Sequence, residues 1–183
     1  MSMTLNKILI AKIDNKNEPS TFKEASKHEC WMEAMKVEYE ALMKNKTWDL
    51  VPYPNEKNVI GNKWIYKVKF NLVGDIEKYK ARLVAKGFAQ KYGIDYEETF
   101  APVEKMPTVR IILALSIAQG WKVFQLDIKS AFLNGDLDVE IFMNQLEGFV
   151  VKEKESFVCK LKKSLYGLKQ APRAWYKKYF NIL

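Results

Sequence analysis

The sequence predicts an α+β fold, in which strands are grouped along the chain instead of alternating strictly with helices. Residues 22–45 carry apolar side chains at the spacing of an amphipathic helix. Residues 59–70 and 76–86 alternate between apolar and polar side chains, and a turn-forming stretch at 71–75 separates them. Together these segments indicate a helix followed by a hairpin, with further strands and helices in the second half of the chain.

The first helix is expected to have a capped start. Residues 1–19 are polar and weakly patterned, and we expect them to form a loose lead-in. Thr21 and Glu24 match a capping box, in which the Thr hydroxyl accepts from an early helix amide and the Glu reaches back to the cap. The apolar stripe that follows is interpreted as core packing and consists of Trp31, Met35, Tyr39 and Leu42.

A two-stranded ribbon with one cationic side is predicted after a short strand at 47–51. Period-two alternation sorts the side chains of each ribbon strand onto two faces. In 59–70 the apolar face holds Trp64, Tyr66, Val68 and Phe70, and the other face holds Lys63, Lys67 and Lys69. In 76–86 one face holds Lys78, Lys80, Arg82, Val84 and Lys86, and the other holds Tyr79, Ala81, Leu83 and Ala85.

The second half of the chain is predicted to contain two helices and three strands. Pro107 suits the first turn of a helix, and Gly120 suits its end. An apolar strand is expected to carry Asp127 near its C-terminal end. The predicted elements are a helix over 107–119, strands over 122–128, 139–143 and 156–161, and a helix that opens at Pro172.

An acidic stretch follows the turn at Asn134-Gly135. Asp136, Asp138 and Glu140 alternate, so they share one face if the segment is a strand. Such a face resembles a metal site, but the favoured interpretation is a solvated acidic edge, which discourages pairing with another strand.

Composition bounds the class of protein. With 183 residues and 48% hydrophobic side chains, the chain is one domain or most of one and can bury a core. It contains no apolar run of about 20 residues, so no transmembrane helix is expected. Cys30 and Cys159 lack a CxxC partner and are interpreted as ordinary thiols. The single histidine, His28, excludes a histidine-rich metal site.

The net charge of +8 is unevenly distributed. Residues 57–91 carry nine basic and two acidic side chains, and residues 152–183 carry the same numbers. Between them, residues 92–151 carry four basic and nine acidic side chains. Basic segments attract phosphates and acidic ones attract divalent cations, so this alternation favours a polyanion together with metal ions as partners.

Several separated motifs resemble one known family. They are Trp31-Met-Glu-Ala-Met35 through Asn45-Lys-Thr-Trp48, Lys63-Trp64, Tyr79-Lys-Ala-Arg-Leu-Val-Ala-Lys-Gly-Phe88, Gly93-Ile-Asp-Tyr96 through Phe100-Ala-Pro-Val103, Gln125-Leu-Asp-Ile128 through Phe132-Leu-Asn-Gly135, and Ser164-Leu-Tyr-Gly-Leu-Lys-Gln-Ala-Pro-Arg-Ala-Trp-Tyr176. Over about residues 20–180 the chain resembles the reverse transcriptase domain of Ty1/copia-type retrotransposon polyproteins. The resemblance implies a right-hand polymerase, with fingers and a partial palm over 20–183 and an antiparallel sheet with packed helices.

The resemblance assigns the basic ribbon to the fingers. Lys80, Arg82 and Lys86 become candidates to hold the triphosphate of an incoming dNTP, since Arg offers a bidentate fork and Lys a point charge. The sequence does not fix which of the three touches phosphate. Lys63, Lys67 and Lys78 on the same ribbon become candidates for contact with nucleic acid.

The resemblance makes Asp127 the first palm carboxylate. Polymerases use two metal ions about 3.5–4 Å apart, one activating the primer 3′-hydroxyl and the other neutralising the leaving pyrophosphate. Mg²⁺ prefers oxygen ligands, so Asp127 and the Ile128 carbonyl are expected to supply part of the set, with Mn²⁺ as an alternative ion.

Two further segments are expected to border the nucleotide. Phe132 resembles the steric gate, a ring that leaves no room for a 2′-hydroxyl and so selects dNTP over rNTP by a clash. Tyr166 is expected to contact base or sugar, and Lys169 and Arg173 are expected to contact phosphate. By themselves, the aromatic residues would be assigned to the core.

The family also has a Tyr-x-Asp-Asp hairpin, which carries the other palm carboxylates. These 183 residues contain no adjacent Asp pair, so we expect a chain that is truncated before the hairpin and inactive alone. The expected partners are an RNA/DNA primer–template, dNTPs and the missing palm, thumb and other Pol domains, in a cytoplasmic retrotransposon particle. The alternatives are a non-catalytic nucleic-acid-binding remnant and a remnant that does not fold stably.

Overall fold

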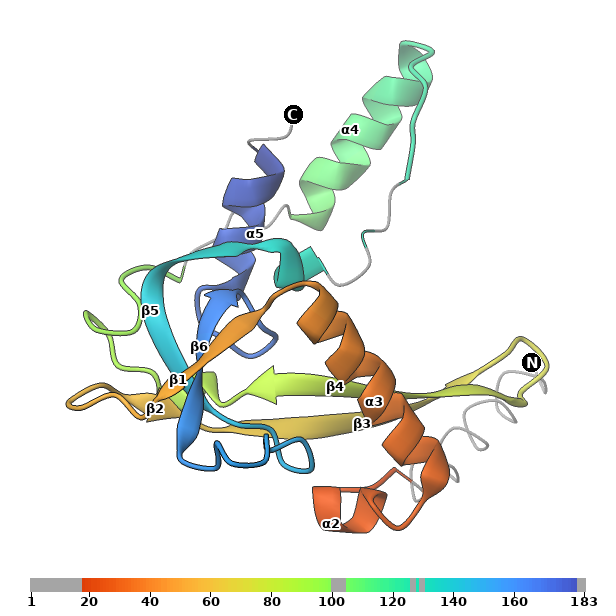
Figure 1. The fold of residues 1–183 in the computed structure, drawn as a ribbon. Helices are drawn as coiled ribbons and strands as arrows, with labels where there is room; N and C mark the ends of the chain where they lie inside the picture. Colours follow the sequence, from red (N-terminus) through yellow and green to blue (C-terminus); the bar gives the residue numbers. More distant parts are fainter. Residues whose placement is uncertain (1–17, 100–104, 126–127, 129–130, 181–183) are drawn as a thin grey trace.

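The computed structural model describes residues 18–99, 105–125, 128 and 131–180, and its elements form a mixed α+β fold (Figure 1). The elements, in chain order, are α2 (Phe22–Ala25), α3 (Glu29–Lys44), β1 (Trp48–Pro52), β2 (Val59–Ile60), β3 (Asn62–Phe70), β4 (Ile76–Ala85), the short 3₁₀ helix η2 (Gly87–Ala89), α4 (Met106–Ala118), the 3₁₀ helix η3 (Ala131–Asn134), β5 (Asp136–Asn144), β6 (Phe157–Lys163) and α5 (Ala171–Phe180).

The strands form two sheets. The larger has the order β1-β6-β5-β2, with antiparallel pairing of β6 to both β1 and β5. The expectation of an antiparallel sheet is wrong at one edge, because β2 pairs with β5 in parallel, Val59 opposite Phe142 and Ile60 opposite Met143. The sheet is therefore mixed. A parallel neighbour needs a crossover connection, and the chain from β2 to β5, which includes the β3–β4 hairpin and α4, provides it.

The β3–β4 hairpin confirms the predicted alternation. Trp64 and Tyr66 are buried on one face, while Lys63, Lys67 and Lys69 are exposed on the other. On β4, Ala81, Leu83 and Ala85 are buried and alternate with Lys80, Arg82 and Val84. Helix α3 packs against β4, and Figure 1 shows it crossing the hairpin. The ring of Trp31 on α3 meets Tyr79 of β4 edge-on, with centroids 4.8 Å apart.

The single helix predicted over 22–45 is two helices. Thr21 caps α2, its hydroxyl accepting from the Glu24 amide at 3.2 Å, as the capping box predicts. The other half of the box differs, because the Glu24 carboxylate accepts from the Ser20 amide at 2.8 Å instead of from Thr21. The chain then leaves helical geometry at His28, which is extended with φ −123° and makes no side-chain cap bond. Ser26 lies in the break, and its hydroxyl donates to the Lys23 carbonyl, the kind of local bond with which Ser competes against helix continuation.

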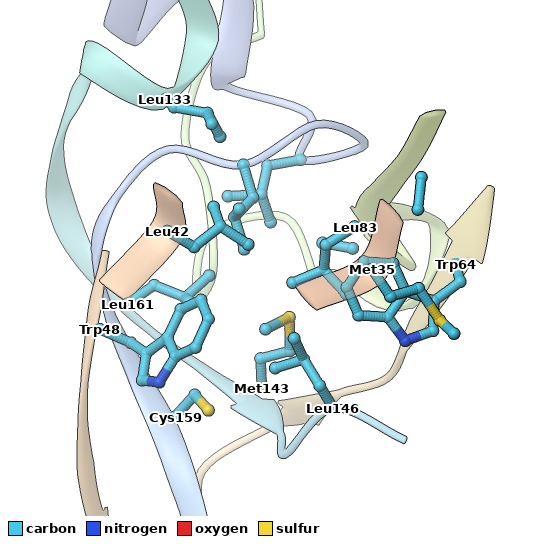
Figure 2. Close-up of a cluster of buried hydrophobic side chains, with 14 of the residues drawn as sticks. Met35, Leu42, Trp48, Trp64, Leu83, Leu133, Met143, Leu146, Cys159 and Leu161 are labelled. Atoms are coloured by element: carbon cyan, nitrogen blue, oxygen red, sulfur yellow. The ribbon is translucent and has the colours of Figure 1, made fainter. Parts of the chain in front are cut away.

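The core lies between α3, the larger sheet and the buried face of the hairpin (Figure 2). Met35, Leu42, Leu83, Met143 and Leu161 are each at most 3% exposed. Burying one such side chain stabilises a fold by about 1.5–3 kcal/mol, so this cluster joins both sheets into one body.

The predicted strand at 122–128 is wrong in the part that the structure describes. Residues 121–125 and 128 are in no strand, because an apolar run becomes a strand only where a partner completes its ladder. Asp127 lies outside the described residues.

Helix α4 occupies the predicted place, but Ser116 is its one buried residue, and apolar side chains such as Ile111 and Ile117 are exposed. None of the helices in the described segments is long and apolar enough to cross a bilayer.

Candidate nucleotide and nucleic-acid site

Three of the predicted dNTP-binding residues lie together. The Arg82 guanidinium carbon is 5.4 Å from the centroid of the Tyr166 ring. The same ring meets Phe132 edge-on, with centroids 5.5 Å apart and an interplanar angle of 81°. These side chains come from β4, from the 164–170 loop and from η3, so three segments distant in sequence converge on one cation and two rings.

The 164–170 loop is docked on the end of β4 by its backbone. The Ala85 amide donates to the Tyr166 carbonyl at 2.8 Å, and Val84 and Tyr166 form a parallel bridge. The approach is too close for side chains: a Cβ on Gly167 would lie 2.2 Å from the Ala85 carbonyl oxygen, and Gly167 has φ +90°. Glycine at this position therefore sets how near Tyr166 comes to β4.

A buried pair of glutamines fastens the same loop from the other side. Gln90 Nε2 donates to Gln170 Oε1 at 3.0 Å, and Gln90 Oε1 accepts from the Lys169 amide at 2.9 Å. Gln170 Nε2 in turn donates to the Asp95 carbonyl at 3.0 Å. Both glutamines are at most 8% exposed. A fully bonded buried network of this kind rigidifies what it joins.

Asp95 extends this network to a second loop. Its carboxylate is 3% exposed and accepts from Asn58 Nδ2 at 2.6 Å and from the Lys91 amide at 2.7 Å. Sequence reasoning missed Gln90, Gln170 and Asp95, which come together only through contacts between residues far apart in the chain. The signal available was that Gln170 and Asp95 lie within the quoted motifs and that Gln90 lies two residues after one of them.

Lys80 lies on β4 near Glu38 of α3, and the charge of each affects the pKa of the other. Partial burial and then the neighbouring charge of Arg82 lower its pKa, while Glu38 on α3 opposes that shift. Burial raises the pKa of Glu38, against a hydrogen bond from the Leu83 backbone and the charges of Lys80 and Arg82. Lys80 and Lys78 line a groove of about 580 Å³ between α3 and β4.

The other basic residues of the ribbon lie along its length. Lys63 is exposed opposite Val84, and Lys78 is exposed opposite Lys69. Lys67 forms an ion pair with Glu18. The Lys86 amide donates to the Gly61 carbonyl at 2.8 Å, and its aliphatic chain runs beside that glycine. These four side chains are spread over the ribbon instead of being gathered at the Arg82–Tyr166–Phe132 cluster.

Lys169 and Arg173 both contact the 90–99 loop. Lys169 Nζ donates to the Tyr96 hydroxyl at 2.8 Å and lies 4.6 Å from the centroid of that ring. Arg173 forms an ion pair with Glu98. A cavity of about 200 Å³ adjoins these contacts, lined by Tyr96, Glu97, Glu98, Asp136, Leu137, Asp138, Val139, Gln170, Arg173, Ala174 and Lys177.

The acidic stretch of β5 is neutralised by lysines. Asp136 pairs with Lys163 and Lys178, and hydrogen bonds from these two side chains, in that order, lower its pKa. Asp138 pairs with Lys177, and Glu140 pairs with Lys160 and Lys57. Strand β2 pairs with β5 only at Phe142 and Met143, and the pairing of β5 with β6 is interrupted between Asp136 and Ile141. Asp136, Asp138 and Glu140 are exposed, as the interpretation of a solvated acidic edge predicts.

No group of three metal-ligating side chains is present among the residues that the structure describes. Ile128 is described and is 40% exposed, but Asp127 lies outside these residues. The described part of the chain therefore offers no complete ligand set for Mg²⁺.

Comparison with known proteins identifies the family. Residues 45–183 match the model of the family described as reverse transcriptase (RNA-dependent DNA polymerase). The chain is 48% identical over 168 residues to the retrovirus-related Pol polyprotein from transposon RE1 of Arabidopsis thaliana, covering 91% of this chain and 12% of that protein. It is 50% identical over 174 residues to the retrovirus-related Pol polyprotein from transposon TNT 1-94 of Nicotiana tabacum, covering 93% of this chain and 13% of that protein.

A more distant relative is the transposon Ty1-ER2 Gag-Pol polyprotein of Saccharomyces cerevisiae, 32% identical over 161 residues, which cover 85% of this chain and 9% of that protein. The chain thus spans about an eighth of the length of the plant polyproteins that it matches. No solved structure gives a match. The chain belongs to the reverse transcriptase (RNA-dependent DNA polymerase) family and is homologous to the Pol polyproteins of Ty1/copia-type retrotransposons.

Proposed function

We propose that residues 20–183 supply the fingers and the first part of the palm of a right-hand, RNA-directed DNA polymerase. The observation that carries this proposal is the meeting of Arg82, Tyr166 and Phe132. A guanidinium beside two rings suits a nucleoside triphosphate, because the fork can hold phosphate oxygens while a ring lies against the sugar or base. Residues 1–19 remain a lead-in with no assigned role.

Within this site each side chain has a distinct task. Arg82 holds the triphosphate at the cluster. Lys80 and Lys86, which lie away from the cluster, add positive charge that attracts the triphosphate. Phe132 excludes a 2′-hydroxyl by its bulk, which selects dNTP by a clash rather than by an attraction. Tyr166 contacts both side chains, the Arg82 guanidinium and the Phe132 ring, and so couples the position of the triphosphate to that of the sugar.

The remaining basic residues bind the primer–template. Lys63, Lys67 and Lys78 on the ribbon, and Lys169 and Arg173 after it, supply phosphate contacts of the kind that fix a duplex in register without reading its sequence. The template would be RNA and the primer 3′ end the acceptor of the nucleotidyl group. The rest of a Pol polyprotein, in a cytoplasmic retrotransposon particle, is the proposed setting.

Divalent metal use follows from the family. Two Mg²⁺ ions, or Mn²⁺ in their place, would activate the primer hydroxyl and neutralise pyrophosphate. Asp127 and the Ile128 carbonyl would provide oxygen ligands to them. These groups are only part of the set, since an octahedral ion needs further carboxylate and phosphate oxygens.

Binding of a labelled dNTP to the 183-residue chain with an RNA/DNA primer–template tests the proposal. Arg82→Ala should weaken binding about tenfold or more, the loss expected when a charge-assisted contact is removed. Arg110→Ala, at an exposed position on α4, is the matched control. Phe132→Val should narrow the preference for dTTP over UTP. Equal affinities of the two arginine variants would contradict the proposal.

A second candidate is nucleic-acid binding without catalysis. It is favoured by one observation: residues 57–91 and residues 152–183 each carry nine basic and two acidic side chains. In that case the chain would bind primer–template with a strong salt dependence, and neither Arg82→Ala nor Phe132→Val would change any nucleotide preference.

A further inference from the structure

The 90–99 loop presents two aromatic rings at the surface. Tyr92 is 74% exposed. Its ring meets the half-buried Tyr96 edge-on, with centroids 5.7 Å apart and an interplanar angle of 70°. The two residues also form a backbone bridge, and the Gly93 amide donates to the Tyr96 carbonyl at 2.9 Å. The rings are therefore held in a fixed arrangement, and neither belongs to the buried core.

The loop that carries these rings is preorganised from beneath. The buried Asp95 carboxylate ties the loop to Asn58 and to the Lys91 amide, and the Asp95 carbonyl accepts from Gln170. Three side chains, those of Asp95, Asn58 and Gln170, thus hold this surface loop in one shape. A loop that a rigid scaffold holds in one shape and that displays a ring suits a binding surface, because binding residues are concentrated on such loops.

The charge beside the rings suits a phosphate backbone. The Lys169 ammonium lies over Tyr96 at 4.6 Å, and Lys91 is exposed one residue before Tyr92. Of the acidic neighbours, Asp95 is buried in its own hydrogen bonds and Glu98 pairs with Arg173, while Glu97 is exposed. Aromatic rings flanked by cations bind single strands, in which each unpaired base offers a face for stacking. A duplex does not offer these faces, because its bases stack on one another.

We propose that Tyr92, Tyr96 and Lys169 form a stacking platform for the unpaired bases of single-stranded nucleic acid. Tyr92 provides the exposed ring on which a base stacks. Tyr96 supports that ring edge-on, and Lys169 contacts the adjacent phosphate. The identification of this strand as the template ahead of the primer end rests on the proposed function; the stacking itself does not.

Fluorescence anisotropy with the 183-residue chain tests the platform. The probes are a labelled 12-nucleotide oligouridine and a blunt duplex of the same label. Tyr92→Ala should weaken binding of the oligouridine at least about fivefold, the smallest loss expected for one stacked base. It should leave duplex binding and the salt dependence unchanged, because no phosphate contact is removed. Tyr92→Trp should retain the affinity. Tyr53→Ala, which removes a tyrosine 59% exposed elsewhere on the surface, is the matched control.

The outcomes separate this inference from the proposed function. If Tyr92→Ala binds the oligouridine as the wild type does, or weakens oligouridine and duplex equally, the platform is wrong, whatever Arg82→Ala does to dNTP binding. If Tyr92→Ala loses only single-strand affinity while Arg82→Ala changes nothing, the platform stands and the proposed function fails. A thermal melt of each variant establishes that the comparison is between folded chains.

Discussion

The side-chain amide of Gln90 donates to the side-chain oxygen of Gln170 across 3.0 Å, although 80 residues separate the two in the chain. Gln90 follows η2 directly, and Gln170 precedes α5. Between Gln170 and β6 lies the loop with Tyr166, so this bond connects the end of the ribbon to the segment that carries a candidate nucleotide contact. The geometry of the candidate site therefore depends on a residue outside it.

Replacing Gln90 by Ala should loosen the 164–170 loop. The change leaves the Lys169 amide and the Gln170 side chain without their partner, and each unsatisfied buried group costs about 1–3 kcal/mol. Urea unfolding should show that loss in the free energy of unfolding, and hydrogen exchange at residues 165–170 should accelerate. Gln119→Ala, at the exposed end of α4, should change stability by less than about 0.5 kcal/mol. Equal free energies of unfolding for the two variants would show that the network does not stabilise the fold.

Gly167 and Gly74 form a matched pair that separates backbone strain from a steric clash. Both have positive φ, +90° and +100°, but a Cβ on Gly74 meets nothing within 4 Å, whereas one on Gly167 meets the Ala85 carbonyl at 2.2 Å. Gly74→Ala should cost about 1–2 kcal/mol from backbone strain alone. Gly167→Ala should cost about 1–3 kcal/mol more through overpacking and should also weaken dNTP binding. Denaturant unfolding of both variants measures the difference, and equal costs would refute the clash.

The buried thiol of Cys159 should make the fold sensitive to alkali. Burial raises the pKa of Cys159 to about 12, from an ordinary value of 9.0. Because the folded pKa lies above the unfolded one, the thiol stabilises the fold fully below about pH 9, and that contribution is lost as the pH rises toward 12. In this window the wild type should lose about 1.4 kcal/mol more per pH unit than Cys159→Ala does.

Urea unfolding under reducing conditions at pH 7, 9, 10 and 11 measures these slopes. Cys159→Ala will be less stable at pH 7, since it removes a buried sulfur, so the slope and not the absolute stability is the readout. Cys30→Ala, at an exposed cysteine, should follow the wild type. Parallel slopes for the wild type and Cys159→Ala would mean that another group causes the loss.

Local sequence patterns predict the ribbon. The pairing in the larger sheet and the network around the site depend on contacts between residues far apart in the chain. The alternation around Trp64 and Leu83 is sufficient to predict the hairpin, because its two strands are adjacent in the sequence and pair with each other. The parallel β2–β5 pairing joins residues 83 apart, Val59 with Phe142, and no local period encodes it. For the site, Arg82, Tyr166 and Phe132 were predicted from the family resemblance, and the structure brings them into contact. Gln90, Gln170 and Asp95 have no periodic signature, so only the folded chain reveals them.

Primer extension is the last test, and the 183-residue chain should give none. Two-metal catalysis needs several carboxylates to hold its ions, and the only carboxylate assigned to that role within these 183 residues is that of Asp127. The described residues add no group of three metal ligands, and the carboxylates of Asp136 and Asp138 are already occupied by lysines. The assay is extension of a labelled DNA primer on an RNA template with dNTPs, in Mg²⁺ and in Mn²⁺. Extension by the wild type that disappears in Asp127→Asn would overturn the expectation, because the chain would then contain a complete catalytic site.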